Sequence, residues 1–181
     1  LERMFADEPL TPACAPRGTV GIPSVLNQCE NYPFWHTFFT QFGFQVVLSP
    51  RYSNKLYKTG IDTIPSESVC YPAKLVHGHI EWLMARKVDR IFFPSVTYEW
   101  KEFDYSNNHY NCPVVGSYSD VIRCNVGRLQ EDRIRLHNPF MNLADLNSGQ
   151  KVLLQEFAGE GIGTRAMKRA IHAAWRDLRK P

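Results

Sequence analysis

The chain has 181 residues, of which 44% are hydrophobic and 22% are charged, and its formal net charge is +3. These values are ordinary for a folded globular domain, and they exclude a disordered tail and a fibrous repeat. No stretch reaches the roughly 20 apolar residues of a membrane span, and no basic-then-apolar signal pattern opens the chain, so we expect a cytoplasmic protein that does not contact a membrane.

The charge is concentrated near the carboxyl end of the sequence. Residues 165–180 hold six basic residues and one acidic residue, a net charge of +5, which leaves −2 for residues 1–164. A nucleic-acid function would therefore depend on a single helix face, and a charge run of this kind is usually a solvated surface. We expect no nucleic-acid partner.

The amino-terminal part of the chain reads as a linker followed by alternating strands and helices. Residues 1–17 hold three prolines without a sustained period, which predicts a linker, and residues 18–181 are predicted to form a single α/β domain cut from a larger protein. The first elements we expect are a strand at 19–26, a helix from an N-cap at Asn31 to Gly43, and a strand at 44–50.

The same alternation continues to the end of the chain. A helix is expected to start just after Cys70, where Pro72 suits the first turn, and to end near Lys87. The later predictions are a strand at 89–96, a polar and aromatic loop at 97–112, a short strand at 113–117, a helix at 118–126, a strand at 134–140 and two closing helices, with glycines at 159–163 breaking the chain before the last helix at about 164–179.

This order of elements predicts the fold class. Apolar runs that alternate with helix signals are typical of a parallel sheet with helices on both faces. We expect a doubly wound, mostly parallel α/β sheet of the Rossmann-like or flavodoxin-like kind, followed by C-terminal helices. In such sheets ligands bind outside the carboxyl ends of the strands. The loops near Ser24, Ser49, Ser95 and Ser117 are therefore the candidate face.

Cys70 is the best-placed polar group for chemistry. A thiol at a helix N-terminus lies near unpaired N–H groups and the positive end of the helix dipole, which favours thiolate, and Lys74 one turn later adds a positive charge. The alternative is a buried, inert cysteine. A Cys–His hydrolase is a further possibility, but His77 would lie about 10.5 Å along the helix axis, so a base would have to come from His36 or His109.

Cys112 could approach Cys70 from the end of the long loop. The five cysteines are odd in number and include no CxxC pair, so zinc-ribbon, ferredoxin and thioredoxin patterns are absent. Two converging thiolates would be half of an iron–sulfur site, whose other ligands could come from Cys29, Cys14, a non-cysteine group or a partner chain. Cys124, inside a predicted helix, is expected in the core.

Four stretches carry a family resemblance. They are GIPSVLNQCENYPFWHTFFTQFGFQVVLSP, GIDTIPSESVCYPAKLVHGHI, FFPSVTYE and NCPVVGSYSDVI, within about 18–178. The chain resembles the domain of unknown function in large CoA-substrate-specific enzyme activase proteins, which are related to the 2-hydroxyacyl-CoA dehydratase and benzoyl-CoA reductase systems. The resemblance implies a parent polypeptide with sugar-kinase-like ATPase domains, an electron-transferring cluster and segments akin to the dehydratase subunits.

This segment resembles the dehydratase-like part. It lacks the DxGxT motif of the ATPase, so no ATP binding is expected. The resemblance implies a [4Fe–4S] cluster with Cys70 and Cys112 as metal ligands and Lys74 and Ser95 as further cofactor-binding positions, where Ser95 stands in place of a cysteine that is frequent in the family. The implied partners are the other domains of the polypeptide and an acyl-CoA enzyme. The competing hypothesis is a structural or interaction module without cluster or catalysis, and a thiol enzyme is the third.

Overall fold

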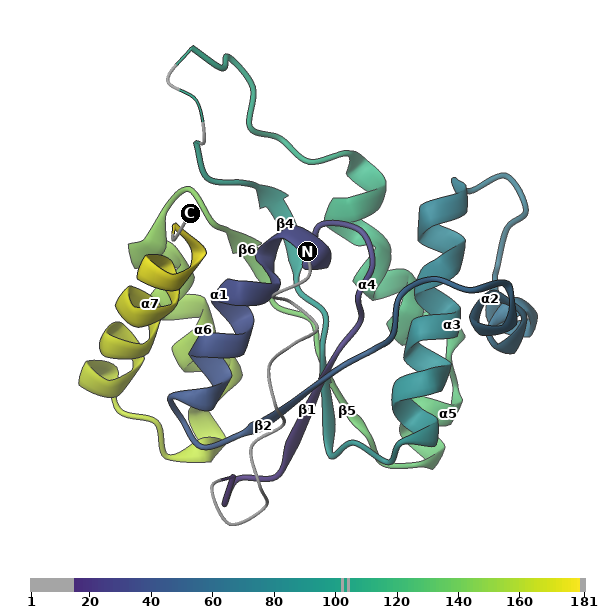
Figure 1. Cartoon of the computed structure of the whole chain (residues 1–181), viewed down its shortest axis with the longest axis horizontal. Helices are drawn as coiled ribbons and strands as arrows, with labels where there is room; N and C mark the ends of the chain where they lie inside the picture. The colour runs from purple at the N-terminus through teal and green to yellow at the C-terminus, as the bar shows by residue number, and fades with distance from the viewer. Residues whose placement is uncertain (1–14, 102, 104, 180–181) are drawn as a thin grey trace.

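The computed structural model describes residues 15–101, 103 and 105–179. Its centre is a parallel sheet in the order β2-β1-β3-β5 (Figure 1). The four strands are β1 (Thr19–Ile22), β2 (Gln45–Leu48), β3 (Arg90–Phe92) and β5 (Arg135–His137). β1 pairs with β2 on one side and with β3 on the other. The chain therefore goes outward from β1 to the edge strand β2, crosses back past β1 to β3, and continues to β5. The prediction of an α/β fold with a parallel sheet is confirmed.

Two prolines divide strands that the sequence predicted as continuous. β4 (Ser95–Tyr98) and β6 (Phe140–Asn142) form a separate parallel pair directly after β3 and β5. The Phe93 N–H donates to the His137 carbonyl and the Ser95 N–H to the Pro139 carbonyl, both at 2.9 Å, so the pairing continues across the breaks. Proline has no N–H for the ladder, and Pro94 and Pro139 therefore separate the predicted runs 89–96 and 134–140 into two strands each.

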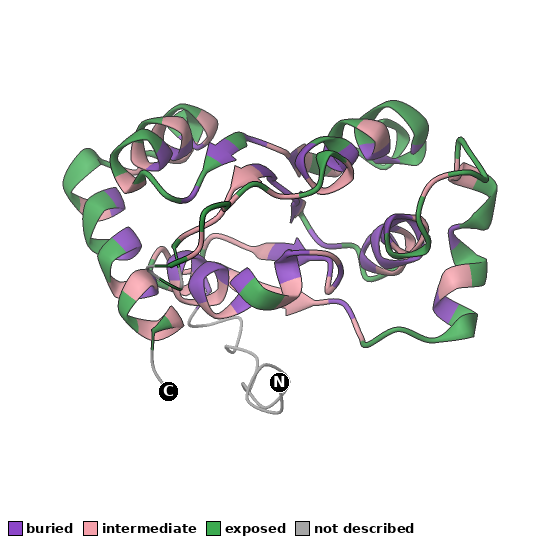
Figure 2. Ribbon diagram, turned by 90° about the horizontal axis from the view of Figure 1, so that it is seen from above, coloured by how far each residue is buried: buried purple, intermediate pink, exposed green. Residues whose placement is uncertain are grey.

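Helices cover both faces of the sheet, as Figure 2 shows from above. One face carries α1 (Gln28–Thr40), α6 (Leu146–Glu156) and α7 (Thr164–Leu178). The other carries α2 (Asn54–Thr59), α3 (Tyr71–Ala85), α4 (Pro113–Asn125) and α5 (Arg128–Glu131). Two short 3-10 helices complete the described chain, η3 (Ile61–Thr63) and η4 (Ala158–Glu160).

The two helical layers have separate apolar cores. In β3, Phe92 packs into the cluster with α1, α6 and α7, whereas Ile91 and the following Phe93 pack into the cluster with α3 and α4. Successive strand residues point to opposite faces, so an uninterrupted apolar run suits a strand that is covered on both sides.

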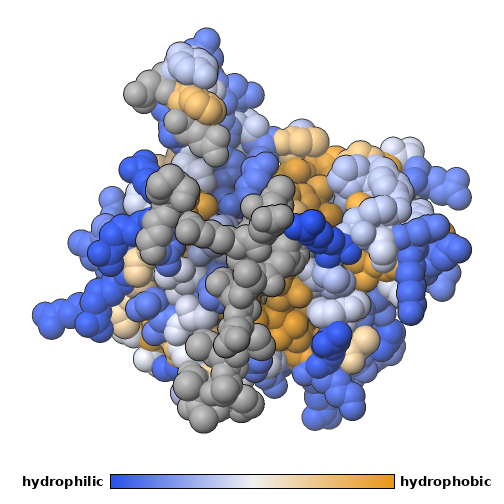
Figure 3. Space-filling model, viewed as in Figure 1, coloured by the Kyte–Doolittle hydropathy of each residue, from blue (hydrophilic) through white to orange (hydrophobic). Residues whose placement is uncertain are grey.

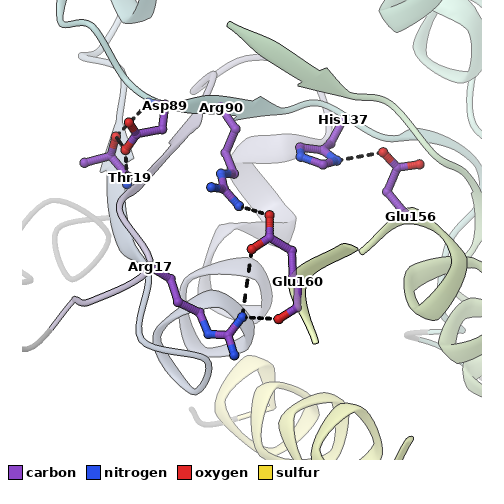
Figure 4. A network of polar contacts seen from close by, with 7 residues as sticks. All are labelled: Arg17, Thr19, Asp89, Arg90, His137, Glu156 and Glu160. Atoms are coloured by element: carbon purple, nitrogen blue, oxygen red, sulfur yellow. Dashed lines mark hydrogen bonds and ion pairs between the residues drawn. The ribbon is translucent and has the colours of Figure 1, made fainter. Parts of the chain in front are cut away.

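The amino-terminal edge of the sheet is held by a polar network (Figure 4). The Glu160 carboxylate in η4 accepts from Arg90 Nη1 at 2.5 Å, and Arg17 Nη1 donates to the Glu160 backbone oxygen. Beside them, the Asp89 carboxylate accepts from the backbone N–H and hydroxyl of Thr19, at 2.7 and 2.8 Å, which lowers the pKa of Asp89. The Glu160 contacts attach the segment between α6 and α7 to the sheet, and the Asp89 contacts join the start of β1 to the start of β3.

The start of α1 was predicted wrongly. The helix begins at Gln28 with Asn27 as N-cap, one turn before the predicted cap at Asn31, and Pro33 lies inside it. Asn31 does not cap the helix, because its amide contacts the Glu99 carboxylate.

The strand predicted at 113–117 is also wrong. Residues 113–125 form one helix, α4, with Pro113 in its first turn, so Ser117 lies on a helix and not at a strand end. A short apolar run such as PVVGS fits a strand and a helix equally by periodicity. Cys124 is exposed on this helix, contrary to the expected core position, because α4 buries another of its faces.

Other expected boundaries are confirmed. α3 begins directly after Cys70, and α7 occupies the predicted last helix. Between α6 and α7, Gly161 adopts a left-handed conformation with φ of 66°, as suits a glycine that ends a helix. Within the described part of the chain, no helix has the length and apolar character needed to cross a membrane.

Candidate functional site

The two carried-over cysteines occupy equivalent positions in neighbouring helices. Cys70 is the N-cap residue of α3 and Cys112 is the N-cap residue of α4, and both side chains are exposed. A proline follows each cysteine in the first helical turn, where its missing N–H costs no hydrogen bond. Figure 1 shows α3 and α4 running in the same direction, with both N-termini at the end of the sheet where the parallel strands finish.

Cys70 lies close to the side chains of α4. The Tyr118 hydroxyl, on the second turn of α4, is buried, and burial raises its pKa with a smaller contribution from the nearby Cys70 thiol. Lys74 donates from Nζ to the Glu67 backbone oxygen at 2.6 Å, which holds the loop that enters α3. The loop that precedes Cys70 is therefore tied to α3 by the Lys74 side chain.

His77 connects Tyr118 to the preceding loop. Thr63 Oγ1 donates to the Gly60 carbonyl at 3.0 Å, so it accepts from His77 Nδ1 at 2.7 Å. His77 Nε2 then accepts from the Tyr118 hydroxyl at 3.1 Å. Burial lowers the pKa of His77 to about 4, which agrees with a neutral imidazole.

His79 makes a similar arrangement on the other side of α3. The Ser24 N–H donates to Ser49 Oγ at 2.7 Å, and Ser49 Oγ is hydrogen-bonded to His79 Nδ1, also at 2.7 Å. Burial lowers the pKa of His79 to about 4 as well. The segments that follow β1 and β2 are therefore adjacent, as predicted. The hydrogen bonds of His77 and His79 go to hydroxyl groups and not to a cysteine.

Ser95 lies in the interior. It is 1% exposed, and its Oγ is 2.6 Å from Ser119 Oγ on α4. It is the first residue of β4, whereas the sequence predicted it near the end of a strand at 89–96. Cys70 and Cys112 are exposed, so the carried-over residues are divided between the surface and the core.

The described residues do not by themselves fit a complete [4Fe–4S] cluster. Nowhere in residues 15–101, 103 and 105–179 do three or more His, Cys, Asp or Glu side chains form a group that could hold a metal ion. Cys29 is half-buried beside Ser24, with its thiol pKa raised by burial, and Cys14 lies outside the described residues. Cys70 and Cys112 would be two donors, whereas such a cluster takes four.

Sequence reasoning missed a second polar cluster, which is centred on Glu99. Glu99 Oε1 accepts from Asn27 Nδ2 at 2.9 Å and from Asn111 Nδ2 at 2.7 Å, and Asn31 Nδ2 lies 3.3 Å from both carboxylate oxygens. These residues come from the loop after β1, the first turn of α1, the end of β4 and the residue before Cys112. The only local signal was the pair Asn27 and Asn31, which are four residues apart.

The Glu99 cluster lies at the switch point of the sheet. The segments that follow β1 and the β3–β4 run diverge here, and open α/β sheets bind ligands in the crevice between such loops. A cavity of about 720 Å³ opens beside Glu99, with Asn31, Asn111, Trp100 and Trp175 among its lining residues. Asn27 Oδ1 is buried and has no hydrogen-bond partner among the described residues. This crevice adjoins the cysteine site through Asn111 and Cys112.

Comparison with known proteins gives one match. The family described as CoA enzyme activase uncharacterised domain (DUF2229) matches residues 19–180. No curated protein and no solved structure matches the chain significantly. The match covers the sheet, both helical layers and both cysteine-capped helices, and the chain therefore belongs to the CoA enzyme activase uncharacterised domain family.

Proposed function

We propose that this is a non-ATPase domain of an acyl-CoA dehydratase or reductase activase-like protein, and that Cys70 and Cys112 contribute two thiolate ligands to an iron–sulfur site completed by another domain. Family membership supports the first part. The second part is carried by one observation, the exposed placement of both cysteines as N-caps of neighbouring helices. Thiolates are the preferred ligands of iron–sulfur clusters.

The exposure of the two cysteines favours a cluster bound between two domains over a cluster enclosed by this domain alone. A cluster enclosed by one domain would need four donors from that domain. Here both cysteines are exposed, and Cys70 is followed in the chain by Tyr71, an exposed aromatic residue whose hydroxyl is 2.6 Å from that of the exposed Tyr52. Exposed aromatic side chains are typical of surfaces that another protein domain covers. The partner in this proposal is a further domain of the same polypeptide, acting in ATP-driven electron transfer to an acyl-CoA enzyme.

Side-chain hydrogen bonds hold the backbone next to each cysteine before any ligand binds. Asn111 donates from Nδ2 to both the Val96 carbonyl, at 3.0 Å, and Glu99, which fixes the residue before Cys112. On the other helix, Lys74 holds the loop before Cys70. A ligand pair positioned in this way would meet a partner's cysteines without reordering the chain, which reduces the cost of assembly.

The test is anaerobic reconstitution of the chain with ferrous iron, sulfide and an excess of a small thiol, which stands in for the thiolates that the other domain would supply. We expect protein-bound iron with thiolate-to-iron absorption in the wild type, and a loss of most of this iron in Cys70→Ser and in Cys112→Ser. Cys124→Ser is the matched control, since Cys124 is equally an exposed cysteine but lies at the opposite end of α4. Colourless protein, or equal iron in all three variants, would leave the interaction-module hypothesis as the better one.

A further inference from the structure

One face of α7 carries a row of positive charge. Five exposed side chains line a shallow groove of about 800 Å³ together with Gln41 at the end of α1 and with Ala173. They are Arg165, Lys168, Arg169, His172 and Arg176. On a helix these positions fall within an arc of roughly 100° and span about 16 Å along the axis. Figure 3 shows hydrophilic side chains projecting from the side of the molecule on which Figure 1 places α7.

This face is opposite to the one that packs on the domain. Met167, Ala170 and Ala174 are at most 2% exposed and belong to the apolar core shared with α1. The packing of α7 therefore needs none of the five basic side chains. Their substitution should leave the fold intact.

The row has no counter-charge among the described residues. None of the five side chains has a hydrogen bond or an ion pair there. Some basic residues elsewhere are paired with carboxylates, as Arg90 with Glu160, Arg123 with Asp120 and Arg128 with Glu81. The row on α7 differs in that several basic side chains without such a pair follow one another along a single helix face.

The arrangement is also unfavourable for the helix itself. Arg165 and Arg169 are four residues apart, Arg165 and Lys168 are three apart, and like charges at these spacings repel. Arg165 and Lys168 lie in the first two turns, where the positive end of the helix dipole disfavours cations. A cationic row that weakens its own helix is explained if an anionic surface covers it.

We propose that this row, which we call the basic face of α7, docks a carboxylate-rich segment of another protein domain. The length of the row matches about three turns of an acidic helix better than the compact phosphates of a small ligand. Within the groove there is no aromatic side chain other than the His172 ring on which a nucleic-acid base could stack, which favours protein over single-stranded nucleic acid. The basic face lies on α7, which covers the opposite face of the sheet from α3 and α4 (Figure 1), so the inference does not depend on the cysteine site.

The test uses a fluorescein-labelled oligoglutamate peptide of about twelve residues, long enough to follow the row. We expect the 181-residue chain to bind it with an affinity that falls as salt rises, and amide NMR shifts confined to α7 and the end of α1. The variant R165E/R169E/R176E should weaken binding by about tenfold or more. It should melt close to the wild type, since none of the three side chains belongs to the buried face of α7.

The matched control is K55E/K58E/K151E, which reverses three exposed charges on α2 and α6. We expect it to change the affinity less than twofold. Equal weakening by both variants would mean that binding follows net charge alone and would overturn the proposal. A single-stranded oligonucleotide that binds through the same residues more tightly than the peptide would also overturn it, in favour of a nucleic-acid surface.

Discussion

Two buried histidines on α3 are kept neutral by their surroundings. His77 and His79 are each at most 1% exposed, and each ring is hydrogen-bonded to hydroxyl groups of other elements. No carboxylate partner compensates a charge on either ring in these contacts. Burial therefore penalises the imidazolium form, and the pKa of each is about 4.

This environment predicts a loss of stability in mild acid. Between about pH 6.5 and pH 4 the unfolded chain binds protons at both histidines while the native protein does not, so the free energy of unfolding falls as the pH is lowered through this window. The expected loss by pH 5 is about 2 kcal/mol for each histidine. Urea unfolding at pH 7.5 and pH 5 measures it.

His77→Gln and His79→Gln separate the two contributions. Each variant removes one titrating group and should reduce the fall between the two pH values by about 2 kcal/mol, whatever its effect on stability at pH 7.5. A free energy of unfolding that stays constant or rises on acidification in the wild type would show that these rings are charged in the native protein.

At the scale of elements, α2 and α3 approach so closely that only glycine fits between them. A Cβ on Gly78 of α3 would lie 2.2 Å from the Leu56 carbonyl oxygen of α2. The obstacle is backbone, so it cannot rotate away as a side chain would. This contact positions η3, and with it the Thr63 hydroxyl that His77 uses.

Gly78→Ala should therefore destabilise the protein although alanine is the better helix former. We expect a loss of about 1–3 kcal/mol, as for other overpacked sites. Gly149→Ala on α6 is the control, because its Cβ would meet nothing nearer than Met141 Cε at 3.5 Å. That variant should gain about 0.5–1 kcal/mol from reduced backbone entropy. Denaturant unfolding compares the two, and a change of the same sign in both would contradict the close-approach argument.

At the scale of the whole molecule, α7 closes one of the two cores. Its apolar face packs on α1. Four aromatic side chains of α1 are each at most 1% exposed, namely Phe34, Trp35, Phe38 and Phe39. Without α7 a large part of this aromatic surface would face water. The cysteine layer, formed by α3 and α4, has its own core.

A chain that ends at Gly161 should lose cooperative unfolding. The exposed aromatic face of α1 would then bind the dye ANS and promote association, as apolar surface does in partly folded states. Calorimetry and ANS fluorescence measure both effects. The variant R165E/R169E/R176E is the control, since it changes the same helix but keeps its buried face. Cooperative melting of the shortened chain at the wild-type temperature would show that α7 is dispensable to the core.

Much of this architecture follows from local sequence. Buried runs such as TVGI and RIFF, separated by helical segments, predict a parallel sheet because only strands covered on both faces need so many consecutive apolar residues. The Cys70-Tyr71-Pro72 order predicted the start of α3, and the period of α7 predicted its buried face. Short segments were less certain, as 113–117 shows, because five residues hold too little of either period.

The composition of the site was decided by the tertiary structure. Glu99 meets Asn27 and Asn31 across about 70 positions of sequence, and Cys70 approaches Tyr118 across 48, because neighbouring elements of the sheet bring these loops to one edge. The same packing places Ser95 inside, against Ser119. Local patterns encode which face of an element is apolar, whereas the partners of a polar side chain depend on the order and spacing of strands that are distant in the chain.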